Sequence, residues 1–181
     1  MRYAVASLQR VSLLAALAVA IQGFAADPRL DAPNVVPITA RLVTSGQPSP
    51  QALARLGELG YQAVIYLAPS TVPDAVAEEP GILSRQGIEF VHVPIPFGSP
   101  EEKHYLEVSE ALKRLHAKKV LVHCQVNMRA SSMVFLHRVL HGKEDPEKAY
   151  ESVAQVWSPG GPWRKLLLAQ LSKATISFEP Y

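Results

Sequence analysis

The sequence predicts an α/β fold with a central, mostly parallel sheet of four to five strands flanked by helices. Short apolar runs alternate with segments of helical periodicity as far as Cys124, and only helical segments follow it. The runs 63–67 and 120–122 are apolar without alternation, which is typical of strands buried on both faces. The C-terminal half is therefore expected to be helical.

Local signals place the individual elements of this fold. Strands are expected at 41–45, 63–67, 89–93 and 120–122, and helices at 49–59, 82–86, 99–117, 129–141, 145–157 and 162–173. The residues Ser99-Pro100-Glu101-Glu102 resemble a capping box with proline in the first turn. Tyr105, Val108, Leu112 and Leu115 then repeat at the spacing of one helix face.

Residues 1–25 have the pattern of a cleavable secretory signal. Arg2 and Arg10 precede an apolar run at 11–21, and small residues follow at Gly23 and Ala25. The apolar run is too short to span a bilayer. Because Cys124 is the one cysteine, no lipid-bearing cysteine can lie at the cleavage point. We expect cleavage after Ala25, no stable membrane anchor afterwards, and a periplasmic or secreted single domain at 26–181.

The charge balance gives no general attraction for nucleic acid. The leader contains two of the 18 basic side chains and none of the 16 acidic ones, so the mature chain would be close to neutral. We therefore expect no nucleic-acid partner.

Cys124 lies where a functional loop is expected. A lone thiol cannot form an internal disulfide, and an isolated cysteine is usually a small buried apolar residue. Here, however, a buried strand ends at His123-Cys124, and a helix begins near Arg129. Ligands of open α/β sheets bind at the carboxyl ends of the strands, and helix N-termini favour anions.

The residue types of this loop suit covalent phosphoryl chemistry. The backbone amides of 125–129 can converge on one anion, and the same field favours the thiolate of Cys124. Arg129 offers a planar fork of donors for two phosphate oxygens. Together they predict a sulfur nucleophile that attacks phosphorus while the loop binds the equatorial oxygens. We expect His123 to tune Cys124 through local hydrogen bonds.

Several segments resemble the bacterial beta-lactamase-hydrolase-like phosphatase domain family, which is related to the dual-specificity and tyrosine phosphatases. They are the 123–129 loop, Ser45-Gly46-Gln47-Pro48, and the stretches 64–67 and 91–96. The resemblance covers most of 36–157 and implies a three-layer cysteine-phosphatase fold and a hydrolase that needs no cofactor. Its substrate would be a phosphorylated small molecule or a phosphoprotein. It implies Cys124 as nucleophile, Arg129 as phosphate binder, and a substrate-binding loop of Gln125, Val126, Asn127, Met128 and Ala130.

The loop departs from the tyrosine phosphatase pattern in several ways. Four residues separate Cys124 from Arg129, where ordinary tyrosine phosphatases have five. Rhodanese-like sulfurtransferases have the shorter length, as does the family loop Cys-Arg-Ser-Gly-Thr-Arg-Ser. Asn127 replaces the family glycine, and asparagine tolerates positive φ well. Val126 and Met128 make the rim apolar. The usual hydroxyl after the arginine is absent at Ala130, and Ser131 or Ser132 either substitutes for it or is an ordinary helix residue.

The general acid is not evident from the sequence. Tyrosine phosphatases protonate the leaving oxygen with an aspartate upstream of the cysteine, but 94–98 contains no acid. Glu101 and Glu102 are nearest in sequence and are also explained as first-turn helix charges. Asp74, Glu78 and Glu79 lie on another loop, where a solvated position is the simpler expectation. The histidines lack metal-ligand spacing apart from His137 and His141, so no metal site is expected.

Three functions remain open from the sequence. The first is a phosphomonoester hydrolase that works through a cysteinyl-phosphate. The second is a rhodanese-like sulfurtransferase that carries a persulfide on Cys124. The third is a catalytically degenerate module that binds an anion or a partner.

Overall fold

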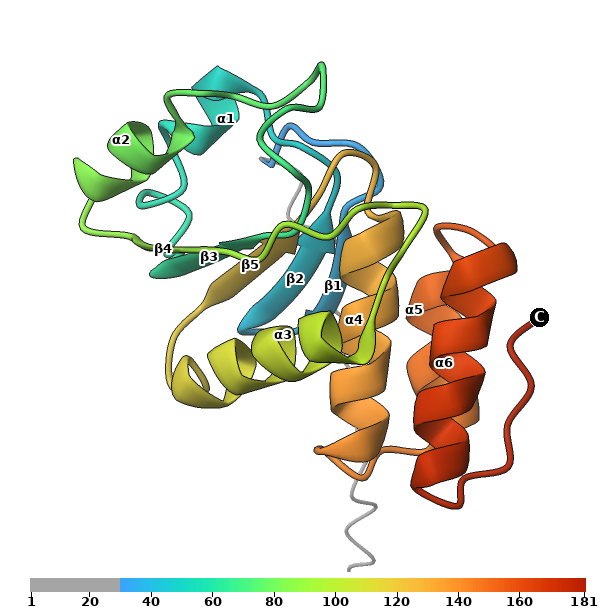
Figure 1. The fold of residues 1–181 in the computed structure, drawn as a ribbon. Helices are drawn as coiled ribbons and strands as arrows, with labels where there is room; N and C mark the ends of the chain where they lie inside the picture. The colour runs from blue at the N-terminus through green and yellow to red at the C-terminus, as the bar shows by residue number, and fades with distance from the viewer. Residues whose placement is uncertain (1–29) are drawn as a thin grey trace, which may run out of the picture.

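The computed structural model describes residues 30–181 and has a five-stranded sheet in the order β1-β2-β5-β3-β4 (Figure 1). All strand pairs are parallel except β1 with β2. The elements are β1 Val36–Thr39, β2 Leu42–Ser45, α1 Pro50–Leu53, β3 Ala63–Tyr66, α2 Glu79–Ser84, β4 Glu89–His92, α3 Glu102–Arg114, β5 Val120–His123, α4 Met128–Leu140, α5 Pro146–Ala154 and α6 Gly161–Lys173. The expected mostly parallel α/β sheet and helical C-terminal half are confirmed.

Helices cover both faces of the sheet, so the fold has three layers. Successive side chains of a strand point to opposite faces. Val64 and Leu121 pack with the leucines of α1 and α2, whereas Ile65 and Val122 pack with the residues of α3 to α6. Because both faces are covered, β3 and β5 are buried at every position, as their unbroken apolar runs predict.

The C-terminal helices form a layer around α4, which runs beside the sheet (Figure 1). The helix packs on β2, β5, α3, α5 and α6, and nine of its 13 residues are buried. Such a helix has apolar side chains on most of its surface because it contacts protein on several sides. Its N-terminus is therefore held firmly against the carboxyl end of β5.

Register brings four strand ends into one row. Ser45 and Tyr66 both pair with His123, and Tyr66 pairs with His92 on its other side. In parallel strands these residues share one edge of the sheet. The segments that follow β2, β3, β4 and β5 therefore all leave the sheet at this edge.

The structure adds one strand that the sequence did not indicate. We expected a proline-rich entry segment before residue 41, but Val36–Thr39 forms β1, antiparallel to β2. Pro37 is compatible with this strand because β1 lies at the edge of the sheet, where an absent N–H costs no ladder bond.

The helix predicted at 49–59 is shorter than expected. Ser49 caps it through the Ala52 N–H at 3.1 Å, but regular helix ends at Leu53. Gln86 explains the early end, because its carboxamide accepts from the Gly57 N–H at 2.9 Å and donates to the Leu53 carbonyl at 2.9 Å. These two groups would otherwise bond to each other in a continuing helix.

Three other boundaries differ from the prediction. Helix α2 begins at Glu79 rather than near Ile82, and α5 ends at Ala154 rather than near Trp157. Helix α3 begins at Glu102 with Glu101 as its N-cap, so Ser99 is not the cap. His104 explains this shift, because its Nδ1 accepts the Glu101 N–H at 3.0 Å.

The predicted leader lies outside the described residues, so its cleavage and the domain boundary at 26 stay predictions. Within residues 30–181, the structure contains no helix with both the length and the apolar character needed to cross a bilayer.

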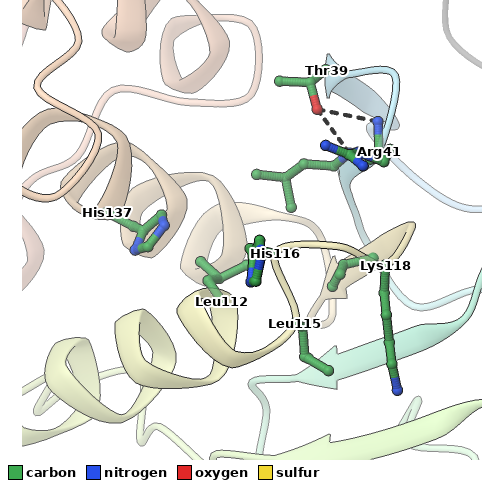
Figure 2. Close-up of a pocket in the computed structure, with 9 residues that line it drawn as sticks. Thr39, Arg41, Leu112, Leu115, His116, Lys118 and His137 are labelled. Atoms are coloured by element: carbon green, nitrogen blue, oxygen red, sulfur yellow. Dashed lines mark hydrogen bonds between the residues drawn. The ribbon is translucent and has the colours of Figure 1, made fainter.

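A cavity of ≈190 Å³ lies at the end of the sheet where β2 and β5 begin, opposite the edge formed by Ser45, Tyr66 and His123 (Figure 2). Its lining includes Arg41, His116, Lys118 and His137. His137 Nδ1 lies 2.9 Å from Ser109 Oγ on α3. Burial, with smaller contributions from the neighbouring charges of His141 and Lys113, lowers the pKa of His137 to about 4. His137 is therefore neutral in the folded protein at neutral pH.

The lowered pKa of His137 predicts a loss of stability in mild acid. Between pH 6.5 and about 4 the unfolded chain takes up a proton that the folded chain does not, so the free energy of unfolding falls as the pH falls through this range. Urea unfolding at pH 7 and pH 4.5 should show a smaller loss in His137→Gln than in the original chain. An equal loss in both proteins would contradict this assignment.

Candidate active site

Cys124 directly follows β5, the strand between β2 and β3. Its N–H donates to the Ser45 carbonyl at 3.3 Å, which continues the pairing of β5 with β2 by one residue. The next residues turn away from the sheet and enter α4. The predicted order of strand, loop and helix is therefore present, with Cys124 at the row of strand ends.

Neighbouring segments hold the carbonyls of the loop from outside. The Gln125 carbonyl accepts from the Gln47 N–H at 2.9 Å, and the Val126 carbonyl accepts from Asn34 Nδ2 at 3.0 Å. In a trans peptide the N–H points opposite to the carbonyl. The N–H of Val126 therefore points away from Gln47.

Asn127 makes the turn into the helix. Its φ is 71°, the left-handed region predicted for this position. The side chain stabilises this conformation, because Nδ2 donates to the Asn34 carbonyl at 2.7 Å and to Thr44 Oγ1 at 3.0 Å. Asparagine thus supplies the backbone geometry of a glycine and also anchors the loop to β2 and to the segment before β1.

The N-terminus of α4 has free donors. Asn127 is its N-cap, and no side chain caps it. The first intrahelical bond runs from the Ser131 N–H to the Asn127 carbonyl at 2.9 Å. The N–H groups of Met128, Arg129 and Ala130 precede that bond, so they have no partner inside the helix. Free N–H groups and the helix dipole make this end of α4 suitable for an anion.

Arg129 is buried beside this loop. Its Nε donates to the Ile95 carbonyl at 2.9 Å, and its guanidinium carbon lies 5.1 Å from the centre of the Phe97 ring. Nη1 donates to Gln125 Oε1 at 3.3 Å. Residues 95–97 therefore hold one edge and one face of the guanidinium, and Nη1 is directed to a loop side chain at a distance typical of a weak bond.

The thiol of Cys124 has no exposed surface. Cys124 forms no disulfide, and it belongs to the hydrophobic core that also includes Ala68 and Ala130. An incoming phosphate can therefore reach the sulfur only if side chains around Cys124 move. It must also displace Gln125 from Arg129, because the carboxamide oxygen accepts from Nη1.

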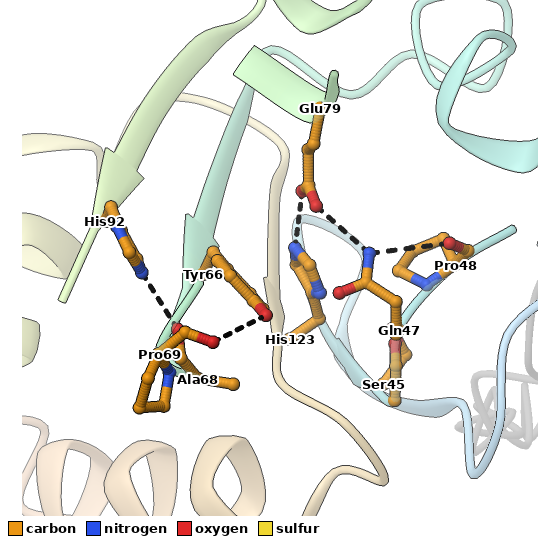
Figure 3. A network of polar contacts seen from close by, with 10 residues as sticks. Ser45, Gln47, Pro48, Tyr66, Ala68, Pro69, Glu79, His92 and His123 are labelled. Carbon is orange, nitrogen blue, oxygen red and sulfur yellow. Dashed lines mark hydrogen bonds and ion pairs between the residues drawn. The ribbon is translucent and has the colours of Figure 1, made fainter. Parts of the chain in front are cut away.

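A buried polar network includes His123, the residue that precedes Cys124 in the chain (Figure 3). His123 Nε2 is 2.7 Å from Glu79 Oε1, and Gln47 Nε2 donates to Glu79 Oε2 at 3.0 Å. His123 has no exposed surface, and the exposed fraction of Glu79 is 2%. Gln47 thus binds the loop through its backbone and Glu79 through its side chain.

Tyr66 lies at the centre of the charges around the loop. Its ring stacks on His123 at 4.8 Å and on His92 at 5.1 Å between centroids. Burial and, to a smaller extent, the charges of Glu79, Asp74 and Cys124 raise the pKa of Tyr66 to about 12 against the opposing charge of Arg129. The phenol therefore stays neutral at physiological pH, and these four groups lie within electrostatic reach of it.

Glu79 is the residue that sequence reasoning missed. A solvated loop position was expected, but Glu79 begins α2 and its carboxylate is enclosed against His123. The wrong expectation arose because Glu79 is 44 residues from His123 in sequence, so no local pattern links them. The aromatic residue Tyr66 and the histidine at the strand ends were the available signals for a polar cluster.

Of the candidate acids Asp74, Glu101 and Glu102, only Asp74 forms a hydrogen bond with the loop. Asp74 Oδ1 accepts from Gln125 Nε2 at 2.8 Å, so Asp74 touches the loop. Glu101 Oε2 lies 3.0 Å from Lys103 Nζ, and Glu102 Oε2 lies 2.5 Å from Lys173 Nζ. Both glutamates lie at the start of α3, which begins beside the middle of α4 rather than at its N-terminus (Figure 1).

The two candidate hydroxyls also differ. Ser131 Oγ donates to the Met128 carbonyl at 3.2 Å, which is the bond of an ordinary helix serine. Ser132 Oγ is buried, and it has no hydrogen-bond partner among the described residues. Of the two, Ser132 has the hydroxyl that is free to respond to a ligand.

Apolar side chains line the loop on the outside. Val126 and Phe97 each have an exposed fraction of 41%. The Phe97 ring lies against Trp157 and Trp163, with centroids 5.8 Å and 5.7 Å away, and Trp163 Nε1 donates to the Phe97 carbonyl at 2.9 Å. The two tryptophans thus act as packing anchors for the segment that holds Arg129.

Within residues 30–181, no group of three or more His, Cys, Asp or Glu side chains is arranged to hold a metal ion.

Gly46 lies so close to the loop that an added methyl group should destabilise the fold. A Cβ at Gly46 would lie 2.7 Å from the Gln125 carbonyl oxygen and 2.8 Å from Pro33 Cβ. Gly46→Ala should cost about 1–3 kcal/mol of unfolding free energy and displace the loop. Gly98→Ala is the matched control, because a Cβ there meets nothing within 4 Å and Gly98 is not among the glycines with a positive φ. Denaturant unfolding of both variants tests this, and equal stabilities would contradict it.

Comparison with family models and with curated proteins found no match. Solved structures do match. A DUF442 protein from Shewanella putrefaciens, described as a candidate phosphatase, has a TM-score of 0.72 at 24% identity over 78% of this chain and 93% of that one. Tk-PTP in its active form has a TM-score of 0.61 at 23% identity, and the match covers 78% of this chain and 95% of that one.

A third similar structure is the catalytic domain of the PP-IP phosphatase SIW14 from S. cerevisiae, with a TM-score of 0.59 at 15% identity over 84% of this chain and 99% of that one. At these identities the likeness concerns the fold. The described part of the chain therefore has the fold shared by dual-specificity and tyrosine phosphatases.

Proposed function

We propose that this chain is an exported cysteine-dependent phosphatase, with Cys124 as the nucleophile and Arg129 as the phosphate-binding residue. The uncapped N-terminus of α4, directly after Cys124 and beside the Arg129 guanidinium, carries the proposal. The phosphatase names of proteins with the same fold add to it.

The geometry supports stabilisation of a trigonal-bipyramidal phosphoryl group. The first-turn amides of α4 and the Val126 N–H are free to bind equatorial oxygens, and their orientation is maintained by the contacts of the loop carbonyls. Donors that are already oriented cost little reorganisation when charge develops. Arg129 then replaces its bond to Gln125 Oε1 with bonds to the oxyanion.

The substrate class that we propose is a phosphomonoester on a small molecule or a protein. Val126 and Phe97 present apolar surface at the rim, and Met128 is half-buried beside them. A leaving group would therefore contact mainly apolar atoms. No nucleic-acid substrate is proposed, because the mature chain is nearly neutral.

The complete burial of Cys124 favours a second candidate, an anion-binding module without turnover. Such a module needs the amides and Arg129 but no access to sulfur. Phosphate that binds only the folded state raises the melting temperature in either case. Turnover separates them, because the module would gain stability from phosphate and hydrolyse no activated aryl phosphate.

The nucleophile and the phosphate binder are tested by two substitutions in reduced mature protein. Cys124→Ser should lower the kcat for para-nitrophenyl phosphate by roughly 10³-fold or more, since a weak nucleophile replaces the thiolate. Arg129→Lys should lower it by about 10²–10³-fold, because the lysine point charge cannot form the two-oxygen fork.

Arg85→Lys is the matched control, since Arg85 is exposed at the end of α2. Vanadate should inhibit the original chain. A folded, reduced protein that hydrolyses no activated aryl phosphate would end the phosphatase proposal and leave the binding module.

Export is tested with the full chain in a Gram-negative host. The periplasmic or secreted fraction should contain protein that begins at Ala26, as mass spectrometry of the intact chain would show. Leu14→Arg places a charge inside the apolar run, so the uncleaved form should accumulate in the cytoplasm. Equal cleavage of both proteins would contradict a signal at 1–25.

A further inference from the structure

A cysteine phosphatase must protonate its leaving group, and the structure limits the candidates for that proton donor. An alkoxide or phenoxide leaves slowly unless an acid within hydrogen-bond reach gives it a proton. The segment between β4 and α3 has one acid, Glu101, which is the N-cap of α3 and lies 3.0 Å from Lys103 Nζ through its Oε2. Two other carboxylates contact residues at the loop: Asp74 binds Gln125, and Glu79 lies against His123, the residue before Cys124. The acid should therefore be one of these two.

Glu79 is already engaged on both oxygens. Oε1 lies 2.7 Å from His123 Nε2, and Oε2 accepts from Gln47 Nε2 at 3.0 Å. With an exposed fraction of 2%, its carboxylate has no surface to offer a substrate. Glu79 is suited to hold His123 and Gln47 in place, and it is not suited to exchange protons with a leaving group.

Asp74 has the opposite environment. Its side chain is exposed, and Oδ1 accepts from Gln125 Nε2 at 2.8 Å. Gln125 Oε1 in turn accepts from Arg129 Nη1 at 3.3 Å. One carboxamide therefore separates Asp74 from the guanidinium that binds phosphate. Asp74 also lines a cavity of ≈520 Å³ with Gln47, Ser49 and Gln125, so it is accessible from solvent.

We propose that Asp74 is the general acid and base of this site, supplied by the segment after β3 instead of the segment after β4. This proposal rests on the phosphatase function proposed above. The change of segment is small in space, because β3 and β4 are neighbours in register and parallel strands lie about 4.8 Å apart. Both segments leave the sheet at the edge where Cys124 lies.

The chemistry balances with Asp74 in this role. The Cys124 thiolate forms a bond to phosphorus as the bond between phosphorus and the leaving oxygen breaks, and the protonated Asp74 gives its proton to that oxygen. Water then attacks phosphorus, the Asp74 carboxylate takes a proton from the water, and the sulfur–phosphorus bond breaks. Inorganic phosphate leaves, and both the thiolate and the protonated Asp74 are restored.

Gln125 positions the acid in this scheme. Its carboxamide binds Asp74 through Nε2 and Arg129 through Oε1. An oxyanion bound to Arg129 competes with Oε1 for Nη1. Phosphate binding would therefore move the carboxamide away from Arg129 and leave Asp74 beside the bound group.

The test compares two aryl phosphates whose leaving groups differ in their need for a proton. The parameter compared is kcat/KM, which covers only the steps up to formation of the cysteinyl-phosphate and excludes its hydrolysis. With phenyl phosphate, Asp74→Asn should lower kcat/KM by about 10²-fold or more. With 2,4-dinitrophenyl phosphate, whose phenolate leaves unprotonated, kcat/KM should change by less than about threefold, since the acid step contributes little. Asparagine has the same shape and can still accept from Gln125, so the fold should be unaffected.

Glu78→Gln is the matched control, as Glu78 is an exposed acid four residues along the same segment, and it should lower neither rate. An equal loss of kcat/KM on both substrates in Asp74→Asn, or no loss on either, would overturn the assignment. The assignment would also be wrong if Glu79→Gln, and not Asp74→Asn, lost activity on phenyl phosphate alone. If the original chain hydrolyses neither substrate, the phosphatase proposal itself fails.

Discussion

The site depends on how the backbone of the 124–129 loop is held by its neighbours. The Gln125 and Val126 carbonyls bind outward to Gln47 and Asn34, and Asn127 reaches back to Thr44. A buried backbone group must find a partner, so each of these bonds fixes the direction of a peptide plane. The amides that remain free then lie on the side of Cys124 and the α4 N-terminus. The close approach of Gly46 makes this possible, since any side chain there would meet the Gln125 carbonyl.

The carboxylates near the loop are separated by burial. Glu79 is enclosed, with both oxygens hydrogen-bonded, whereas Asp74 is exposed and bonded once. An enclosed carboxylate that pairs with a histidine orients its partner, and an exposed one can meet a substrate and exchange protons with water. The same segment after β3 thus supplies both a structural acid and the acid that we propose for catalysis.

Phe97 and Trp163 hold the Arg129 guanidinium in place. Trp163 is fully buried and bonds to the Phe97 carbonyl, and the Phe97 ring lies under the Arg129 guanidinium. Packing of α6 therefore reaches Arg129 through two aromatic residues. This connection gives α6 a part in the site although α6 contributes no side chain to the loop itself.

Periodicity and capping signals in the sequence determined the strands β2 to β5, the two-face burial of β3 and β5, the helical C-terminal half and the left-handed position of Asn127. These features depend on residues that are near one another in the chain, so local patterns predict them. Tertiary structure alone decided that Val36–Thr39 pairs with β2, that Gln86 ends α1, that Glu79 binds His123, and that Asp74 rather than Glu101 or Glu102 lies at the loop. Apart from the local antiparallel pairing of β1 with β2, these contacts join residues at least 29 positions apart in the chain, so no local pattern predicts them.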